Sequence, residues 1–179
     1  MRLRRVVSRL DSDDFELLGL PRRFRLERSE LDARRRALQA EVHPDRFASA
    51  GAASSRVAMQ WAARVNEAHA RLVDPLSRAA YLCELGGAPI GAEDNTAMPV
   101  DFLMQQMAWR ESLDDASSRA RVEAVAHDVG TQRAAGHARL GELLDDRHDY
   151  VAAAAEVRAL MFVERFATDV DKRLAALGG

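Results

Sequence analysis

The sequence predicts an all-α protein, and three observations lead to that prediction. Of the 179 residues, 47% are hydrophobic and 30% are charged, a balance typical of globular proteins that bury a core. Ala, Leu, Arg and Glu dominate, while β-branched and aromatic residues are sparse, so the summed propensity favours helix. Apolar residues also recur at helical spacing, in segments that Gly and Pro separate.

Four helices are expected in the first half of the chain, at about 13–18, 29–42, 56–73 and 76–85, with a loop of small residues at 48–55. Asp13 or Asp14 can cap the first helix, and Gly19 follows its end. Pro44 and Pro75 close the second and third helices, because the residue before a proline avoids the helical region.

Three further helices are expected at about 100–115, 118–145 and 149–177, and they form a small antiparallel bundle. Apolar stripes run along the last two, with Val122, Val125, Val129, Gly136, Leu140 and Leu143 in one and Leu160, Val163, Phe166, Val170 and Leu174 in the other. The densest Gly/Pro stretch, 86–91, separates the two halves. We therefore predict an N-terminal extension at 1–11, a first domain at 12–87, a linker at 88–98 and the three-helix bundle at 99–179.

Charge and cysteine content exclude several classes of protein. The formal net charge of −2 argues against general attraction to nucleic acids or membranes, so the partners are expected to be proteins. Cys83 is the single cysteine, which excludes an internal disulfide framework and any multi-cysteine metal site, and no metal is expected. The single cysteine also suits a reducing compartment.

The basic N-terminus lacks an apolar stretch long enough for a signal peptide, so a cytoplasmic location is expected. The alternative is a short transit-like extension, since Arg2, Arg4, Arg5 and Arg9 occur there without an acid.

The tripeptide His43-Pro44-Asp45 lies between two predicted antiparallel helices. By itself it indicates only a turn, for which these residues are well suited. Its neighbours make it more specific: Asp14-Phe15-Glu16-Leu17-Leu18-Gly19-Leu20 upstream, and Val65-Asn66-Glu67-Ala68, Leu72, Asp74-Pro75, Arg78 and Tyr81 downstream. Over about residues 12–85 the chain resembles the J domain of co-chaperones.

That resemblance implies docking on a DnaK/HscA-type chaperone and stimulation of its ATPase, with His43, Pro44 and Asp45 as the loop and Arg34, Arg35 and Arg36 as the candidate basic face. Asp45 could form a charge-assisted hydrogen bond with an Arg of the chaperone. Basic side chains would also speed the encounter with an acidic partner surface. The alternative for the arginine run is a solvated helix face.

The helix expected at 100–115 carries apolar residues on two sides. At 100° per residue, one face holds a sufficient core stripe of Phe102, Trp109, Leu113 and Ala116. The opposite side holds Leu103, Met104 and Met107, together with Glu111, Asp114 and Asp115. An apolar strip rimmed by acids indicates a binding surface, and Met suits an adaptable one. The alternatives are a helix buried on both sides and, for Phe162, an aromatic at the edge of the core.

The segment Asp101-Phe102-Leu103-Met104-Gln105-Gln106-Met107, followed by Arg110-Glu111 and Leu113-Asp114, is similar to the first helix of the C-terminal domain in HscB-type co-chaperones of iron–sulfur cluster assembly. The order of J domain, Gly/Pro linker and three-helix bundle is similar too. The resemblance implies that an iron–sulfur scaffold protein is bound by Leu103, Met104, Met107, Glu111, Asp115 and Phe162. Ala108 stands where such proteins carry an acid, and Asp115 is shorter than the usual Glu, so the acidic part is expected to be weaker.

The prediction is therefore a non-enzymatic adaptor that needs no cofactor. The five histidines show no metal-ligand spacing, and the sequence has no glycine-rich phosphate loop or nucleophile elbow. Cys83 is expected to be a packed side chain, not a nucleophile. Two alternatives stay open: a J-domain co-chaperone with a different client, and an Arg-rich nucleic-acid-binding helical protein.

Overall fold

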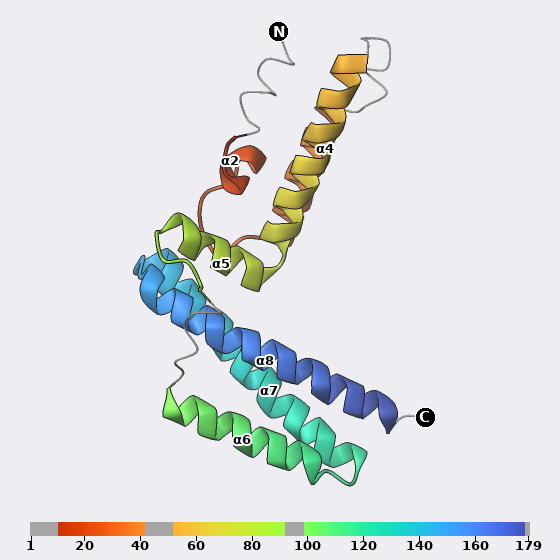
Figure 1. The fold of residues 1–179 in the computed structure, drawn as a ribbon, viewed down its shortest axis with the longest axis vertical. Helices are drawn as coiled ribbons and strands as arrows, with labels where there is room; N and C mark the ends of the chain where they lie inside the picture. The colour runs from red at the N-terminus through yellow and green to blue at the C-terminus, as the bar shows by residue number, and fades with distance from the viewer. Residues whose placement is uncertain (1–10, 42–51, 92–98, 178–179) are drawn as a thin grey trace. The chain divides into compact units, whose positions relative to one another are not determined.

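The computed structural model describes residues 11–41, 52–91 and 99–177, and within these ranges every regular element is helical, with no strand. The elements are α2 (Asp14–Leu18), α3 (Arg28–Glu41), α4 (Ala52–Val73), α5 (Pro75–Leu85), α6 (Val100–Asp114), α7 (Arg119–Gly141), η3 (Glu142–Asp146) and α8 (Tyr150–Ala176). The chain divides into two compact units, Met1–Leu82 and Cys83–Gly179, whose elements appear in Figure 1. The prediction of an all-α fold is confirmed.

Helix α2 is limited by the residues that the sequence indicated. The side chain of Asp13 accepts hydrogen bonds from the backbone N–H groups of Phe15 and Glu16, so Asp13 is the N-cap. Gly19 adopts a left-handed conformation with φ 66°, which suits glycine at a helix C-terminus. Asp14, the other cap candidate, is fully buried and pairs with Arg64 and Arg71 instead.

Helices α3 and α4 form an antiparallel hairpin. Asp32 contacts His69, and Gln39 contacts Asn66, so residues later in α3 meet residues earlier in α4. Trp61 at 1% exposure fills the core between the helices with Leu31, Leu38, Val65 and Leu72. Residues 52–55 were expected in a loop, and that expectation is wrong: α4 already begins at Ala52, since alanines there favour helix.

The second unit contains α6, α7, η3 and α8 as an up-down-up bundle. Arg139 of α7 donates to Glu156 of α8, and Arg133 donates to Glu164, so α7 and α8 run antiparallel. Trp109 of α6 stacks on Phe166 of α8 with ring centroids 5.8 Å apart. Helix α7 and helix α8 lie side by side along much of their lengths, with α6 beyond α7 (Figure 1). The predicted three-helix bundle is confirmed.

The end of α7 departs from regular α-helix. The N–H of Arg147 donates to the carbonyl of Glu142 at 3.0 Å, five residues back, which is π-helical bonding. The wider turn shifts the side chains that follow, so Leu144 is 3% exposed, whereas Leu143, assigned to the core stripe by simple periodicity, is only partly buried. The other five members of that predicted stripe are buried.

The Gly/Pro segment starts with a close contact inside the second unit. A Cβ atom built on Gly86 would lie 2.3 Å from the Tyr150 ring, so the backbone there packs directly against the start of α8. Arg158 of α8 donates to the carbonyl of Ile90 at 2.9 Å. These contacts join the segment that follows α5 to the bundle. The predicted domain limits at 87/88 and 98/99 stay predictions.

Candidate client-binding surface

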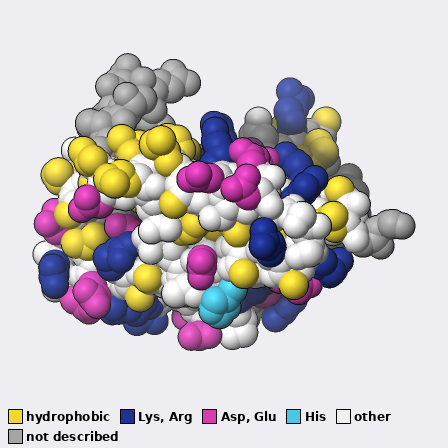
Figure 2. Space-filling model, turned by 90° about the horizontal axis from the view of Figure 1, so that it is seen from below, with side chains coloured by type: hydrophobic (Ala, Val, Ile, Leu, Met, Phe, Trp, Pro, Cys, Tyr) yellow, Lys and Arg dark blue, Asp and Glu magenta, His cyan; other side chains and the backbone are white. Residues whose placement is uncertain are grey.

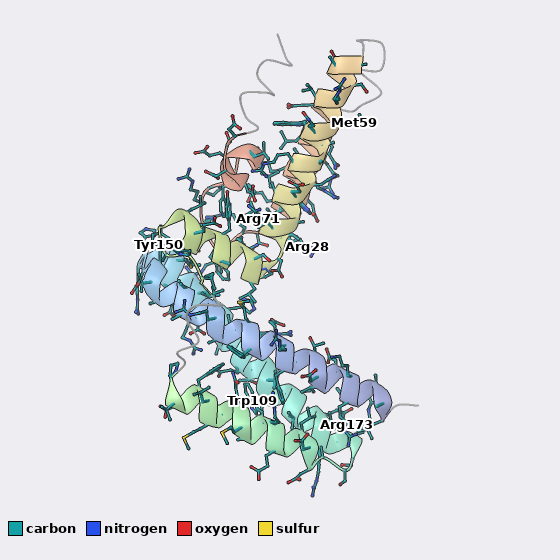
Figure 3. All side chains as sticks on the ribbon, viewed as in Figure 1. Arg28, Met59, Arg71, Trp109, Tyr150 and Arg173 are labelled. Atoms are coloured by element: carbon teal, nitrogen blue, oxygen red, sulfur yellow. The ribbon has the colours of Figure 1, made fainter. Side chains whose placement is uncertain are left out.

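Helix α6 exposes one apolar side and buries the other. Met104 is 64% exposed and Met107 is 72% exposed, whereas Trp109 is only 4% exposed. Figure 3 shows Trp109 on the side of α6 that faces α7 and α8, and sulfur atoms projecting from the opposite side. The alternative of a helix buried on both sides is therefore excluded. We call Leu103, Met104 and Met107 the apolar strip.

A hollow of about 330 Å³ lies beside this strip, between α6 and α8. Its walls are Leu103, Gln106, Met107 and Arg110 from α6, and Phe162, Arg165, Phe166 and Asp169 from α8. Phe162 is 40% exposed, so it adds to the apolar surface beside the strip. Three of the predicted scaffold-binding residues, Leu103, Met107 and Phe162, thus share one concave site.

The remaining predicted contacts lie on the same helix but outside the hollow. Met104, Glu111 and Asp115 are exposed and do not line it. Asp115 ends α6 as its C-cap, so the acids gather at the C-terminal end of this helix. Figure 2, seen from the side on which α6 lies in Figure 1, shows hydrophobic side chains gathered at the surface with acidic and basic ones nearby.

Sequence reasoning missed the polar walls of the hollow: Gln106, Arg110, Arg165 and Asp169. Gln106 and Arg110 lie one helical turn apart on α6, between its two predicted faces. Arg165 and Asp169 repeat the same spacing on α8. That spacing was readable in the sequence, but which two helices face each other was not.

In the first unit, Arg34 and Arg36 are exposed on α3, and Arg35 is partly buried. The guanidinium of Arg34 lies near Gly19 at the end of α2, 3.9 Å from the position a Cβ atom would take there. A cation beside the carbonyl end of a helix is favourable. The predicted loop residues His43, Pro44 and Asp45 lie outside the described residues.

A buried ion-pair cluster joins α2 to α4 in this unit. Asp14 is fully buried, and its carboxylate lies 2.6 Å from Arg64 and 3.0 Å from Arg71. Tyr81 of α5 stacks on Phe15 and lies under the guanidinium of Arg71, 4.7 Å from the ring centroid. The Tyr81 hydroxyl also accepts a hydrogen bond from the backbone N–H of Asp14. The cluster fixes α2 and α5 on the hairpin that carries the candidate basic face.

Within residues 11–41, 52–91 and 99–177, His, Cys, Asp and Glu side chains form no group of three or more that could hold a metal ion. None of the helices described there is long and apolar enough to cross a membrane. Burial raises the pKa of the Cys83 thiol to about 11, which disfavours the nucleophilic thiolate.

Comparison with known proteins extends these observations. Residues 98–171 match a family model described as the HSCB C-terminal oligomerisation domain. The co-chaperone protein HscB homologs of Burkholderia multivorans and Burkholderia cenocepacia are 51% and 49% identical over 175 residues, which cover 96% of this chain and 99% of each relative.

Solved structures give the same result. The chaperone HscB from Vibrio cholerae is 35% identical with a TM-score of 0.78, and the match covers 92% of this chain and 99% of that one. The human co-chaperone protein HscB shares the fold, with a TM-score of 0.84 at 24% identity over 91% of this chain and 82% of that one. The chain is therefore a J-domain co-chaperone, in which a helical hairpin unit is followed by a three-helix bundle. Within that class, the chain belongs to the HscB co-chaperone family.

Proposed function

We propose that the protein delivers an iron–sulfur cluster scaffold protein to a DnaK/HscA-type chaperone and stimulates that chaperone's ATPase. The observation that carries the proposal is the apolar strip: Leu103, Met104 and Met107 are 45%, 64% and 72% exposed on a helix whose other side is packed. Exposed apolar side chains gathered on one helix face are typical of a protein-binding surface. Membership of the HscB family supports an iron–sulfur scaffold protein as the client.

Each of the two units has its own binding partner in this proposal. The hairpin unit binds the chaperone, and the bundle binds the scaffold, so the client is held at high effective concentration beside the ATPase. ATP is hydrolysed by the chaperone, and that hydrolysis supplies the free energy for its action on the scaffold protein. The chain itself acts without a catalytic residue or a cofactor, in the cytoplasm.

Binding of the client rests on the apolar strip and Phe162. Leu103, Met107 and Phe162 surround the hollow, which can receive a side chain of the scaffold and remove it from water. Central apolar contacts of this kind give most of the binding free energy in many interfaces. Glu111 and Asp115 add negative charge at the end of α6, where they favour a basic part of the scaffold.

Calorimetric titration with the scaffold protein tests the client half of the proposal. The variant Leu103→Ala/Met104→Ala/Met107→Ala should lose scaffold affinity while it keeps its melting temperature, with some positions costing roughly 2 kcal/mol or more of binding free energy. The matched control is Phe102→Ala/Trp109→Ala/Leu113→Ala, which should destabilise the bundle. Normal scaffold binding by the first variant would place the client site elsewhere.

Stimulation of the chaperone rests on His43, Pro44 and Asp45 and on the exposed arginines of α3. Asp45→Asn keeps the size of the side chain and removes its charge, so it should abolish stimulation of the ATPase without altering the melting temperature. His43→Gln should act in the same way. Retained stimulation in both folded variants would contradict the chaperone half of the proposal.

A further inference from the structure

The polar side chains around the hollow on the bundle supply hydrogen-bond donors. Arg110 and Arg165 stand on opposite walls, one on α6 and one on α8, and both are exposed. No ion pair involving either guanidinium occurs among the described residues, although many other arginines of the chain are paired. Two cations therefore stand beside an apolar hollow without an ion pair of their own among the described residues.

A third donor lies in the same wall. The side-chain amide nitrogen of Gln106 is buried, and it has no hydrogen-bond partner in the described part of the chain. A buried donor without a partner is unfavourable, so an acceptor that reached it would be bound favourably. The single acid of the wall, Asp169, lies 3.1 Å from Lys172 and is already paired.

We infer that the hollow recognises a segment of the scaffold protein that carries a carboxylate beside a large apolar side chain. This inference rests on the proposed function. The apolar group fills the space between Leu103, Met107 and Phe162. The carboxylate accepts from Arg110, Arg165 or Gln106, since guanidinium–carboxylate hydrogen bonds are stronger than neutral ones.

Calorimetric titration of the full chain with the iron–sulfur scaffold protein tests the inference. Arg110→Glu/Arg165→Glu should weaken binding at least tenfold, because attraction is replaced by repulsion, and the melting temperature should hold since both side chains are exposed. Arg147→Glu is the control, because Arg147 is exposed, follows η3 and does not line the hollow. The affinity of this variant for the scaffold protein should stay within twofold of that of the parent. If the double Glu variant does not fold, Arg110→Gln/Arg165→Gln should still weaken binding at least threefold.

The apolar triple variant separates the two proposals. Loss of affinity for Leu103→Ala/Met104→Ala/Met107→Ala together with unchanged affinity for the arginine variants would overturn the carboxylate inference and leave the client surface intact. An equal loss for Arg147→Glu would also overturn it, because the effect would then be one of overall charge. Absence of scaffold binding by the parent protein would overturn both.

Discussion

The carboxylate of Asp14 lies 2.6 Å from the guanidinium of Arg64, across the contact between α2 and α4. Asp14 is fully buried, whereas the side chains of Arg64 and Arg71 are 23% and 46% exposed. The charged groups therefore differ in what happens when a partner is removed. The arginines can turn toward water, but the carboxylate cannot.

Removal of both arginines should destabilise the first unit more than removal of the acid. In Arg64→Ala/Arg71→Ala the buried carboxyl group is left without its cationic partners, which costs about 3–5 kcal/mol. Asp14→Ala leaves two arginines that water can solvate, so its cost should be smaller. Urea unfolding followed by circular dichroism measures both. A larger loss for Asp14→Ala would contradict this account of the cluster.

Truncation of Trp109 should destabilise the bundle strongly, whereas truncation of Met107 should hardly change its stability. Trp109 is 4% exposed and stacks on Phe166, so Trp109→Ala should cost about 3–5 kcal/mol of folding free energy. Met107 is 72% exposed, and Met107→Ala should stay within about 0.5 kcal/mol of the parent. Thermal and urea unfolding of the two variants give the comparison. Similar losses in both would mean that α6 packs on both sides.

Two glycines in α7 should respond differently to the same substitution. Gly130 has no atom within 4 Å of an added Cβ, so Gly130→Ala should stabilise the helix by about 0.5–1 kcal/mol. At Gly136 an added Cβ would lie 2.6 Å from Leu160 and 2.9 Å from Glu156, and those side chains would have to move. Gly136→Ala should therefore melt at a lower temperature than Gly130→Ala. The reverse order would show that α7 and α8 approach less closely.

The contact between His69 and Asp32 should make the stability of the hairpin depend on pH. The hydrogen bond from His69, 2.7 Å from Asp32, lowers the pKa of the Asp32 carboxyl below its ordinary value of about 3.9. The folded state thus favours the ionised carboxylate of Asp32. Its contribution to folding stability is present above the ordinary pKa and is lost as the pH falls through the lowered pKa of the folded state. The stability difference between the parent and Asp32→Asn should be present above the ordinary carboxyl pKa and shrink in strong acid. A difference that is constant with pH would contradict the assignment.

The Cys83 thiol should be almost inert in the folded protein. Burial raises its pKa to about 11, so the thiolate that reacts with disulfide reagents is scarce at pH 8. A chromogenic disulfide reagent should label the folded chain slowly and the urea-unfolded chain rapidly. Rapid labelling without denaturant would show that the end of α5 opens readily.

Local features of the fold could be read from single segments. Asp13 and Gly19 limit α2 because capping depends on neighbouring residues alone. Apolar spacing along one helix separated Trp109 from Met107, since 100° per residue fixes which side chains share a face. The same rule misplaced Leu143, because periodicity assumes a regular helix and the π-helical bonding of η3 changes the register.

The sequence by itself determined the fold class, the two halves of the chain, the apolar strip of α6 and the resemblance on which the functional proposal rests. Only the tertiary structure decided that Asp14 is buried between Arg64 and Arg71, and that Arg110 and Arg165 face a common hollow. The physical reason is that a helical period describes one helix at a time. Contacts between residues about 50 positions apart depend on how helices pack, and packing is a property of the whole unit.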